Sequence, residues 1–141
     1  MDFQKHLPEM TQHAGLTTPP IFMPSVGNFP QGMLVSVPIH ASSLQKSVTA
    51  AGLTDILQQR YAASHLISVA PDAPLTEAGF LAADKLATSD RMELFVFADE
   101  ASSQFVLTAR LDNLGKGAAG AAVQNMNLML GLNPLEGLNL S

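Results

Sequence analysis

The sequence contains no cysteine and no tryptophan, and it has few charged residues of either sign. Without cysteine the chain has no disulfide framework, no thiolate nucleophile and no thiolate metal site. Lys and Arg together number seven, no basic run occurs, and the formal net charge is −5 at pH 7. A nucleic-acid groove needs clustered cations to neutralise phosphates, so the composition disfavours nucleic acid as a partner.

Long apolar runs and targeting features are also missing. No stretch of about 18 apolar residues occurs, and the sequence therefore predicts no membrane-spanning helix. The opening residues MDFQKHLPEM lack the basic-then-apolar layout of a signal peptide, so we expect a cytoplasmic location. His13, His40 and His65 have no His, Asp or Glu partners at ligand spacing, and no metal site is expected.

Apolar residues are abundant instead. They make up 47% of the 141 residues, while charged residues make up 13%. In typical globular proteins about a quarter of the residues are charged. The length fits one domain, or one piece of a larger protein. A domain of this size cannot bury so many apolar side chains, and the excess indicates a surface that a partner covers.

The hydrophobic pattern predicts strands interleaved with helices. The expected elements are a helix at 6–15, a strand at 32–41, a helix from 49 to 63, a strand at 65–70, a short helix and loop at 75–91, a hairpin of strands 92–98 and 103–110, and a helix from 116 to 130. Thr49 is the expected cap of the second helix. Pro38 cannot donate to a ladder, which places its strand at a sheet edge or a bulge. The order predicts an α+β fold, one mixed or antiparallel sheet with helices on one face.

Residues 111–132, LDNLGKGAAGAAVQNMNLMLGL, look superficially like a nucleotide-binding loop. A P-loop needs a hydroxyl residue directly after its lysine, whereas Lys116 is followed by Gly117. Gly115, Gly117 and Gly120 match the spacing Gly-x-Gly-x-x-Gly, but no strand and no acidic residue follow at the required distance. Both nucleotide-loop interpretations therefore fail, and a helix remains.

Three glycines near the start of this helix each cost about 1 kcal/mol relative to alanine, so a close backbone approach is expected to offset them. The helix divides into an apolar stripe and a polar stripe. The apolar stripe consists of Ala119, Val123, Met126 and Leu130, and the polar stripe of Lys116, Gly120, Gln124 and Asn127. Asp112 or Asn113 is the expected cap. Two interpretations stay open: a tightly packed helix without a ligand, or a small-residue face that lies against a cofactor.

The remaining acidic residues follow no catalytic pattern. Asp84, Asp90, Glu93, Asp99 and Glu100 are expected to form a solvated acidic face.

Three segments together resemble the N-acetyl-gamma-glutamyl-phosphate reductases, the NADPH-dependent enzymes of arginine biosynthesis. They are KHLPEM, FMPSVGNFPQGML and LDNLGKGAAGAAVQNMNLMLGL, which occur in the order that this family has. The resemblance covers nearly the whole chain and is weakest at 71–91. It implies a fold like the C-terminal domain of glyceraldehyde-3-phosphate dehydrogenase. Residues 1–110 would form the substrate-binding and dimerisation domain, and 111–141 a C-terminal helix that packs on the dinucleotide-binding domain.

The sequence departs from the family in what it lacks. The family begins with a Rossmann domain that carries a glycine-rich loop and a catalytic cysteine, and this sequence has neither. The resemblance therefore implies a C-terminal fragment, inactive alone, whose partners are the missing domain and further copies bound through the sheet. NADP(H) is the cofactor that it implies for the complete enzyme, and none is expected to bind this fragment tightly. We expect residues 116–130 to dock on another copy or to be poorly ordered.

The resemblance implies roles for four residues. His6 falls on the acid/base histidine and would exchange protons with the thiol and the oxyanion while an acyl phosphate is reduced to the semialdehyde; an imidazole suits this role because it titrates near neutrality. Gln31, at a position that is often arginine, would hydrogen-bond a substrate amide or carboxylate without adding charge. Gly117 and Asn125 would lie on the cofactor side, with Asn125 toward the nicotinamide. The family's first histidine is replaced by Gln4. Without the resemblance, His6 is typical of an exposed or capping residue.

Two other functions stay open. One is a fragment of a related aspartate- or aminoadipate-semialdehyde dehydrogenase, because the last motif is shared with aspartate-semialdehyde dehydrogenases in a looser form. The other is a non-catalytic interaction module of the same fold. The His-Leu-Pro-Glu segment favours the reductase, and an upstream coding region with the cysteine and the dinucleotide loop would distinguish an enzyme from a module.

Overall fold

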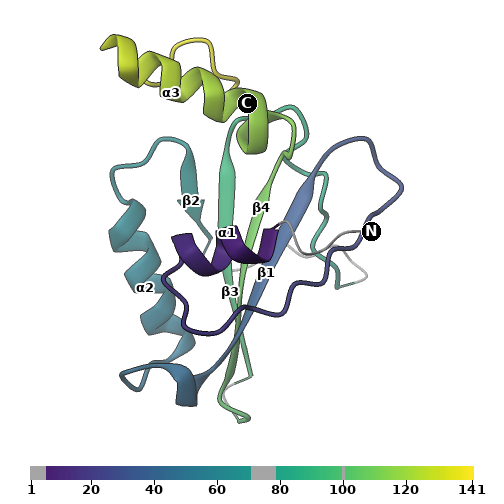
Figure 1. Cartoon of the computed structure of the whole chain (residues 1–141), viewed down its shortest axis with the longest axis vertical. Coiled ribbons are helices and arrows are strands. Elements are labelled where there is room, and N and C mark those ends of the chain that lie inside the picture. Colours follow the sequence, from purple (N-terminus) through teal and green to yellow (C-terminus); the bar gives the residue numbers. More distant parts are fainter. Residues whose placement is uncertain (1–5, 71–78, 100) are drawn as a thin grey trace.

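A mixed sheet forms the centre of the computed structural model, which describes residues 6–70, 79–99 and 101–141 (Figure 1). Over these residues the strands are β1 (Met33–His40), β2 (Ile67–Val69), β3 (Met92–Asp99) and β4 (Gln104–Leu111), in the spatial order β1-β4-β3-β2. β4 is antiparallel to both β1 and β3, whereas β2 runs parallel to β3. The helices are α1 (His6–His13), α2 (Ala50–Tyr61) and α3 (Gly120–Leu130). The predicted α+β class with a mixed sheet is confirmed.

β1 is an edge strand of this sheet, as Pro38 requires. Its apolar residues alternate with polar ones, so Val35 and Val37 lie on the same face as Ala109 and Leu107 of β4. Val35 is 45% exposed and Val37 is 51% exposed. The apolar face of the sheet is therefore open to solvent at β1.

α2 packs against β2 and β3 on this same face, where Leu57 and Tyr61 line one cavity together with Val35 and Val37. The helix begins where the sequence predicts, because the Thr49 hydroxyl accepts a hydrogen bond from the Gly52 N–H at 3.1 Å. Leu53, Leu57 and Tyr61 are half-buried on one stripe. This stripe is what fixes α2 to the sheet.

The turn of the β3–β4 hairpin is stabilised by one carboxylate. Asp99 accepts hydrogen bonds from the Ala101 and Ser102 N–H groups through Oδ1, and from the Ser102 hydroxyl through Oδ2 at 2.7 Å. The Ser102 side chain is the main cause that lowers the pKa of Asp99 below its ordinary value, and the Ser102 and Ala101 N–H groups add to it. Because these bonds favour the charged form, the turn loses this stabilisation as the pH falls through the lowered pKa.

Replacement of Ser102 by alanine is expected to raise the pKa of Asp99 toward its ordinary value, because the strongest of these hydrogen bonds is lost. NMR titration of the Asp99 carboxyl carbon measures this change directly. Ser47→Ala, at an exposed serine outside the hairpin, is the control and should leave the titration as it is. An unchanged Asp99 curve in Ser102→Ala would contradict the assignment.

The segment before β3 differs from the prediction. The short helix expected within 75–91 is not found in residues 79–91, which form turns and irregular backbone, while 75–78 lie outside the described residues. The Ala82 carbonyl accepts a hydrogen bond from Arg110 on β4 at 3.2 Å. This tertiary contact, together with the close approach of Ala83 to Gly32, holds the segment in a non-helical path. No helix in the described part of the chain has the length and apolar character to cross a membrane.

Candidate functional site

Two consecutive residues after β4 hold the turn that precedes β1. Asp112 Oδ2 accepts a hydrogen bond from Gln31 Nε2 at 2.9 Å, and Asn113 Oδ1 accepts one from the Gly32 N–H at 2.8 Å. The antiparallel pairing of β1 with β4 brings these residues together, since Met33 is the register partner of Leu111. Both the side chain of Gln31 and the main chain beside it are therefore fixed.

Asp112 is the most connected polar residue of this region. Its side chain is almost completely buried, with 1% of the residue exposed. Besides Gln31, it accepts hydrogen bonds from the Thr88 N–H at 2.6 Å and the Leu114 N–H at 2.8 Å. Thr88 has a φ of 69°, a conformation that is costly for a residue other than glycine. A buried carboxylate is tolerated when donors surround it, and three donors satisfy this one.

The predicted cap of the last helix is confirmed for Asp112 and not for Asn113. The helical segment starts with a π-helical turn, Gly115–Ala119. The Asp112 carboxylate accepts a hydrogen bond from the Leu114 N–H just before this turn, as an N-cap residue does. Asn113 is instead used by its contact with Gly32. The π-turn is seen in the bond from the Gly117 N–H to the Asp112 carbonyl at 2.8 Å. π-helical turns are rare in proteins overall, and those that occur often lie at functional sites.

The close backbone approach predicted from the glycines exists, and its partner is this chain itself. Gly120 is buried, and a Cβ at this position would lie 2.5 Å from Cγ of Asp90 and closer still to Oδ1. A Cβ at Gly115 would lie 2.9 Å from the Ser89 carbonyl oxygen. These contacts support the interpretation of a tightly packed helix for Gly115 and Gly120. Gly117 differs, because it is exposed and a Cβ there would meet no atom closer than 3.3 Å.

The polar stripe of α3 is the side that packs on the rest of the chain. Asn127 is 3% exposed and donates a hydrogen bond from Nδ2 to the Glu136 carbonyl at 2.8 Å. The segment after α3 folds back toward the start of this helix (Figure 1). There Asn139 exchanges hydrogen bonds with Asp90, from the Asn139 N–H to Asp90 Oδ2 at 2.8 Å and from the Asp90 N–H to the Asn139 carbonyl at 2.7 Å. Residues of the chain's own C-terminal segment therefore cover the polar stripe.

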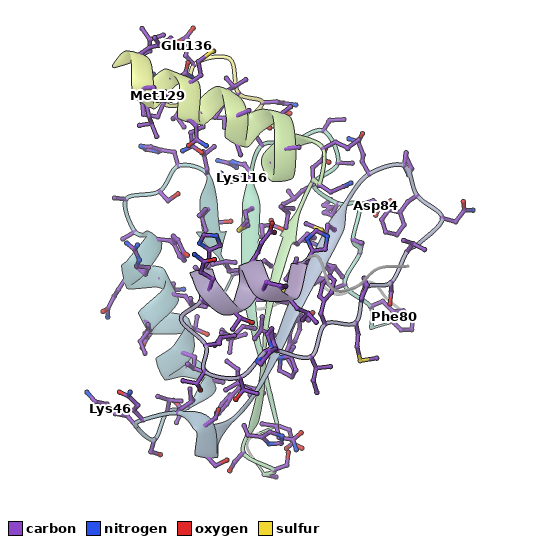
Figure 2. The ribbon with its side chains drawn as sticks, viewed as in Figure 1. Lys46, Phe80, Asp84, Lys116, Met129 and Glu136 are labelled. Carbon is purple, nitrogen blue, oxygen red and sulfur yellow. The ribbon has the colours of Figure 1, made fainter. Side chains whose placement is uncertain are left out.

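The apolar stripe of α3 faces outward except at Val123, which is half-buried. Met126 is 51% exposed and Leu130 is 64% exposed. Met129, which Figure 2 labels on this helix, is 86% exposed. Large exposed apolar patches of this kind mark sites of interaction.

The other predicted site residues lie apart from Gln31. His6 begins α1, and its side chain is 59% exposed, with Nδ1 3.9 Å from Glu9 Oε2. Its ring lies edge-on to Phe22 with the centroids 5.9 Å apart. Asn125 is exposed on α3. Within the described ranges no hydrogen bond, ion pair or ring contact joins His6, Gln31 and Asn125, and no group of three His, Asp or Glu side chains could hold a metal ion.

Local sequence patterns did not reveal how Asp112 and Asp90 organise this region. Asp112 was expected only to cap a helix and Asp90 to lie on a solvated face, but both are buried and bind distant segments. One sequence feature could have indicated the role of Asp112. It directly follows β4, and β4 pairs with β1, the strand that begins just after Gln31. No local signal marks Asp90, because its partners Gly120 and Asn139 are distant in sequence.

A small mixed sheet carries this turn, and the apolar side chains of β1 and α3 remain exposed beside it. The family model that matches the chain is the semialdehyde dehydrogenase dimerisation domain, over residues 4–113. This match covers most of the 141 residues, and the chain belongs to that family. The match agrees with the fold that the resemblance implied.

The individual relatives are more specific. N-acetyl-gamma-glutamyl-phosphate reductases of Brucella ovis, Brucella canis and Brucella abortus are each 50% identical to the chain over 127 residues, which is 90% of its length. The chain spans only 41% of the length of these relatives. The resemblance to this group of reductases is confirmed.

Proposed function

We propose that the chain is the C-terminal domain of an NADPH-dependent N-acetyl-gamma-glutamyl-phosphate reductase, which converts the acyl phosphate to the semialdehyde in arginine biosynthesis. The observation that carries this proposal is the 50% identity over 90% of the chain to proteins of that name. The relatives reported above carry the name of this reductase, which favours it over an aspartate- or aminoadipate-semialdehyde dehydrogenase and over a non-catalytic module. A cytoplasmic location belongs to the same proposal.

We assign different roles to two parts of the chain, in agreement with the apolar surfaces that each part exposes. Residues 1–110 bind substrate and form the interface with another copy, and 111–141 contribute a helix that packs on the dinucleotide-binding domain. Two observations support this division: Val35 and Val37 leave an apolar sheet face open, and Met126 and Leu130 leave an apolar helix face open. Burial of such faces is the main source of favourable free energy in association.

Within the complete enzyme we assign His6 to proton exchange and Gln31 to substrate binding. An imidazole can both accept a proton and return it, which suits a reaction that forms and releases a thiol. NADPH supplies the hydride when it is bound. Gly117 and Asn125 are the residues assigned to its side, and both are exposed on the last helical segment, where a bound nicotinamide could reach them.

The 141-residue chain alone is expected to show no NADPH-dependent turnover of N-acetyl-gamma-glutamyl phosphate, because it has no cysteine to form the thioester. The complete enzyme, made by joining the chain to the amino-terminal part of the Brucella ovis relative, is expected to show turnover. NADPH absorbance measures both. In the joined enzyme His6→Asn should lower kcat by about 100-fold, the lower limit for loss of a general acid or base.

His13→Asn is the matched control for this experiment, since His13 is also exposed on α1. It should leave kcat within about threefold of the unsubstituted enzyme, because surface changes away from a site have small effects. Turnover by the isolated chain would contradict the proposal. A joined enzyme that prefers aspartyl phosphate would support the aspartate-semialdehyde alternative instead.

A further inference from the structure

The side-chain amide of Gln31 uses its nitrogen in a hydrogen bond, whereas its oxygen has no hydrogen-bond partner. Its Nε2 donates to Asp112 Oδ2 at 2.9 Å. A carboxylate only accepts hydrogen bonds, so the nitrogen and not the oxygen of the amide must face Asp112. In the described part of the chain Oε1 has no hydrogen-bond partner, and no buried side-chain oxygen or nitrogen is left without one. Oε1 is therefore accessible to solvent.

The backbone beside Gln31 is held from two sides. The Gly32 N–H donates to Asn113 Oδ1 at 2.8 Å. On the other side, a Cβ at Gly32 would lie 2.6 Å from the Ala83 carbonyl oxygen, and the φ of Gly32 is +122°. Gly32 therefore permits an approach that no other residue would allow. With its backbone and its amide nitrogen both fixed, Gln31 offers its oxygen in one orientation.

The three hydrogen bonds of the Asp112 side chain have different roles. The bonds from the Thr88 and Leu114 N–H groups satisfy backbone donors, and a structural role accounts for them. The bond from Gln31 comes from a side-chain nitrogen and satisfies no backbone donor. It orders a half-buried side chain whose rotamer entropy opposes a single orientation. Ordering of this kind is useful where a ligand must be met in a fixed geometry.

We propose that Asp112 is a positioning residue for Gln31, whose carboxylate turns the Gln31 amide so that Oε1 accepts a hydrogen bond from an N–H donor of the substrate. An N-acylated amino acid carries such a donor in its amide, which a carboxylate or a phosphate does not. This inference rests on the proposed function, in which Gln31 binds the acyl phosphate.

Substitution of Asp112 by alanine removes the acceptor that holds the Gln31 amide. Asparagine would not do so, because its amide oxygen can stay at the position of Oδ2, where both the Thr88 N–H and Gln31 Nε2 donate. In Asp112→Ala the Gln31 amide turns freely, and its oxygen meets the N–H donor of the substrate in only a fraction of its orientations. In the joined enzyme we expect Asp112→Ala to raise KM for the acyl phosphate about tenfold, as misorientation of one substrate hydrogen bond does, with kcat changed less than about threefold.

A double-substitution cycle separates positioning from a structural role. Gln31→Met keeps the length of the side chain and removes its amide, and it should raise KM by a similar factor. Asp112→Ala should then have no further effect on KM in the Gln31→Met enzyme, because the group that Asp112 positions is gone. An equal effect of Asp112→Ala in both backgrounds would overturn the proposal. A normal KM in Gln31→Met would overturn it as well.

A measurement on the unsubstituted chain keeps the test independent of whether Asp112→Ala folds. In an NMR spectrum of the 141 residues, the Nε2 hydrogens of Gln31 are expected to exchange with water about tenfold more slowly than those of Gln58, which is exposed on α2. Equal exchange would overturn the inference alone. Absence of reductase activity in the joined enzyme, with slow Gln31 exchange retained, would instead contradict the proposed function.

Discussion

Glu93→Gln is expected to lower the free energy of unfolding of the chain by about 3 kcal/mol, because it leaves a buried guanidinium without its counter-charge. Arg110 is 1% exposed, and its Nε and Nη2 donate to Glu93 Oε2 at 2.8 and 2.5 Å. The Glu93 side chain is 28% exposed, and partial screening by solvent places the effect at the low end of the range of about 3–5 kcal/mol for broken buried pairs. Urea unfolding followed by circular dichroism measures it.

The double substitution Glu93→Leu with Arg110→Met is the informative comparison. It removes both charges and fills the volume with apolar groups, so we expect it to regain most of the stability that Glu93→Gln loses. Arg110 also stacks over Phe95, with its Cζ 5.1 Å from the ring centroid, and methionine can keep that contact. Glu136→Gln, at an exposed position, is the single-charge control. A double variant less stable than Glu93→Gln would show that the pair itself stabilises the fold.

Gly120→Ala is expected to destabilise the chain by about 3 kcal/mol, the upper part of the range for overpacking. Alanine is the better helix former by about 1 kcal/mol, so a loss of this size must come from tertiary contact. The added Cβ would overlap the carboxylate of Asp90, whose other oxygen is bound by the Asn139 N–H. Asp90 cannot move away without breaking the bond that holds the C-terminal segment.

Gly117→Ala tests the same chemical change in the same segment. A Cβ at Gly117 would lie 3.3 Å from the Asp112 carbonyl oxygen and 3.5 Å from Cδ1 of Leu111, which requires only a small shift. We expect its free energy of unfolding in urea to stay within about 1 kcal/mol of the unsubstituted chain, since gain of propensity and slight crowding oppose each other. Equal losses in Gly117→Ala and Gly120→Ala would show that contact with Asp90 is not the cause.

Local patterns predicted the elements that local interactions determine. The capping of α2 by Thr49 and the edge position of the strand with Pro38 depend on one residue and its neighbours, and both predictions are confirmed. The hairpin of β3 and β4 follows from two alternating runs joined by a polar turn, and it is confirmed as well. The family followed from three motifs whose spacing the sequence displays directly.

Tertiary contacts decided what the sequence did not reveal. Hydrophobic periodicity assumes that the apolar side of a helix faces inward, yet on α3 the polar side does, because Asp90 and the C-terminal segment bind there. Asp90 and Glu93 were expected on a solvated face. Asp90 is buried, and Glu93 pairs with Arg110. The alternation of a strand shows which side chains share a face, but not which face is later covered.

The hydrogen bonds between Asn139 and the segment before β3 affect where a purification tag can be attached. Asn139 bonds both Asp90 and the Thr88 carbonyl, and Thr88 in turn donates to Asp112, which holds Gln31. A purification tag attached after Ser141 begins directly beside this series of bonds. An affinity handle is therefore better placed at Met1, where it leaves the carboxyl end free to fold back.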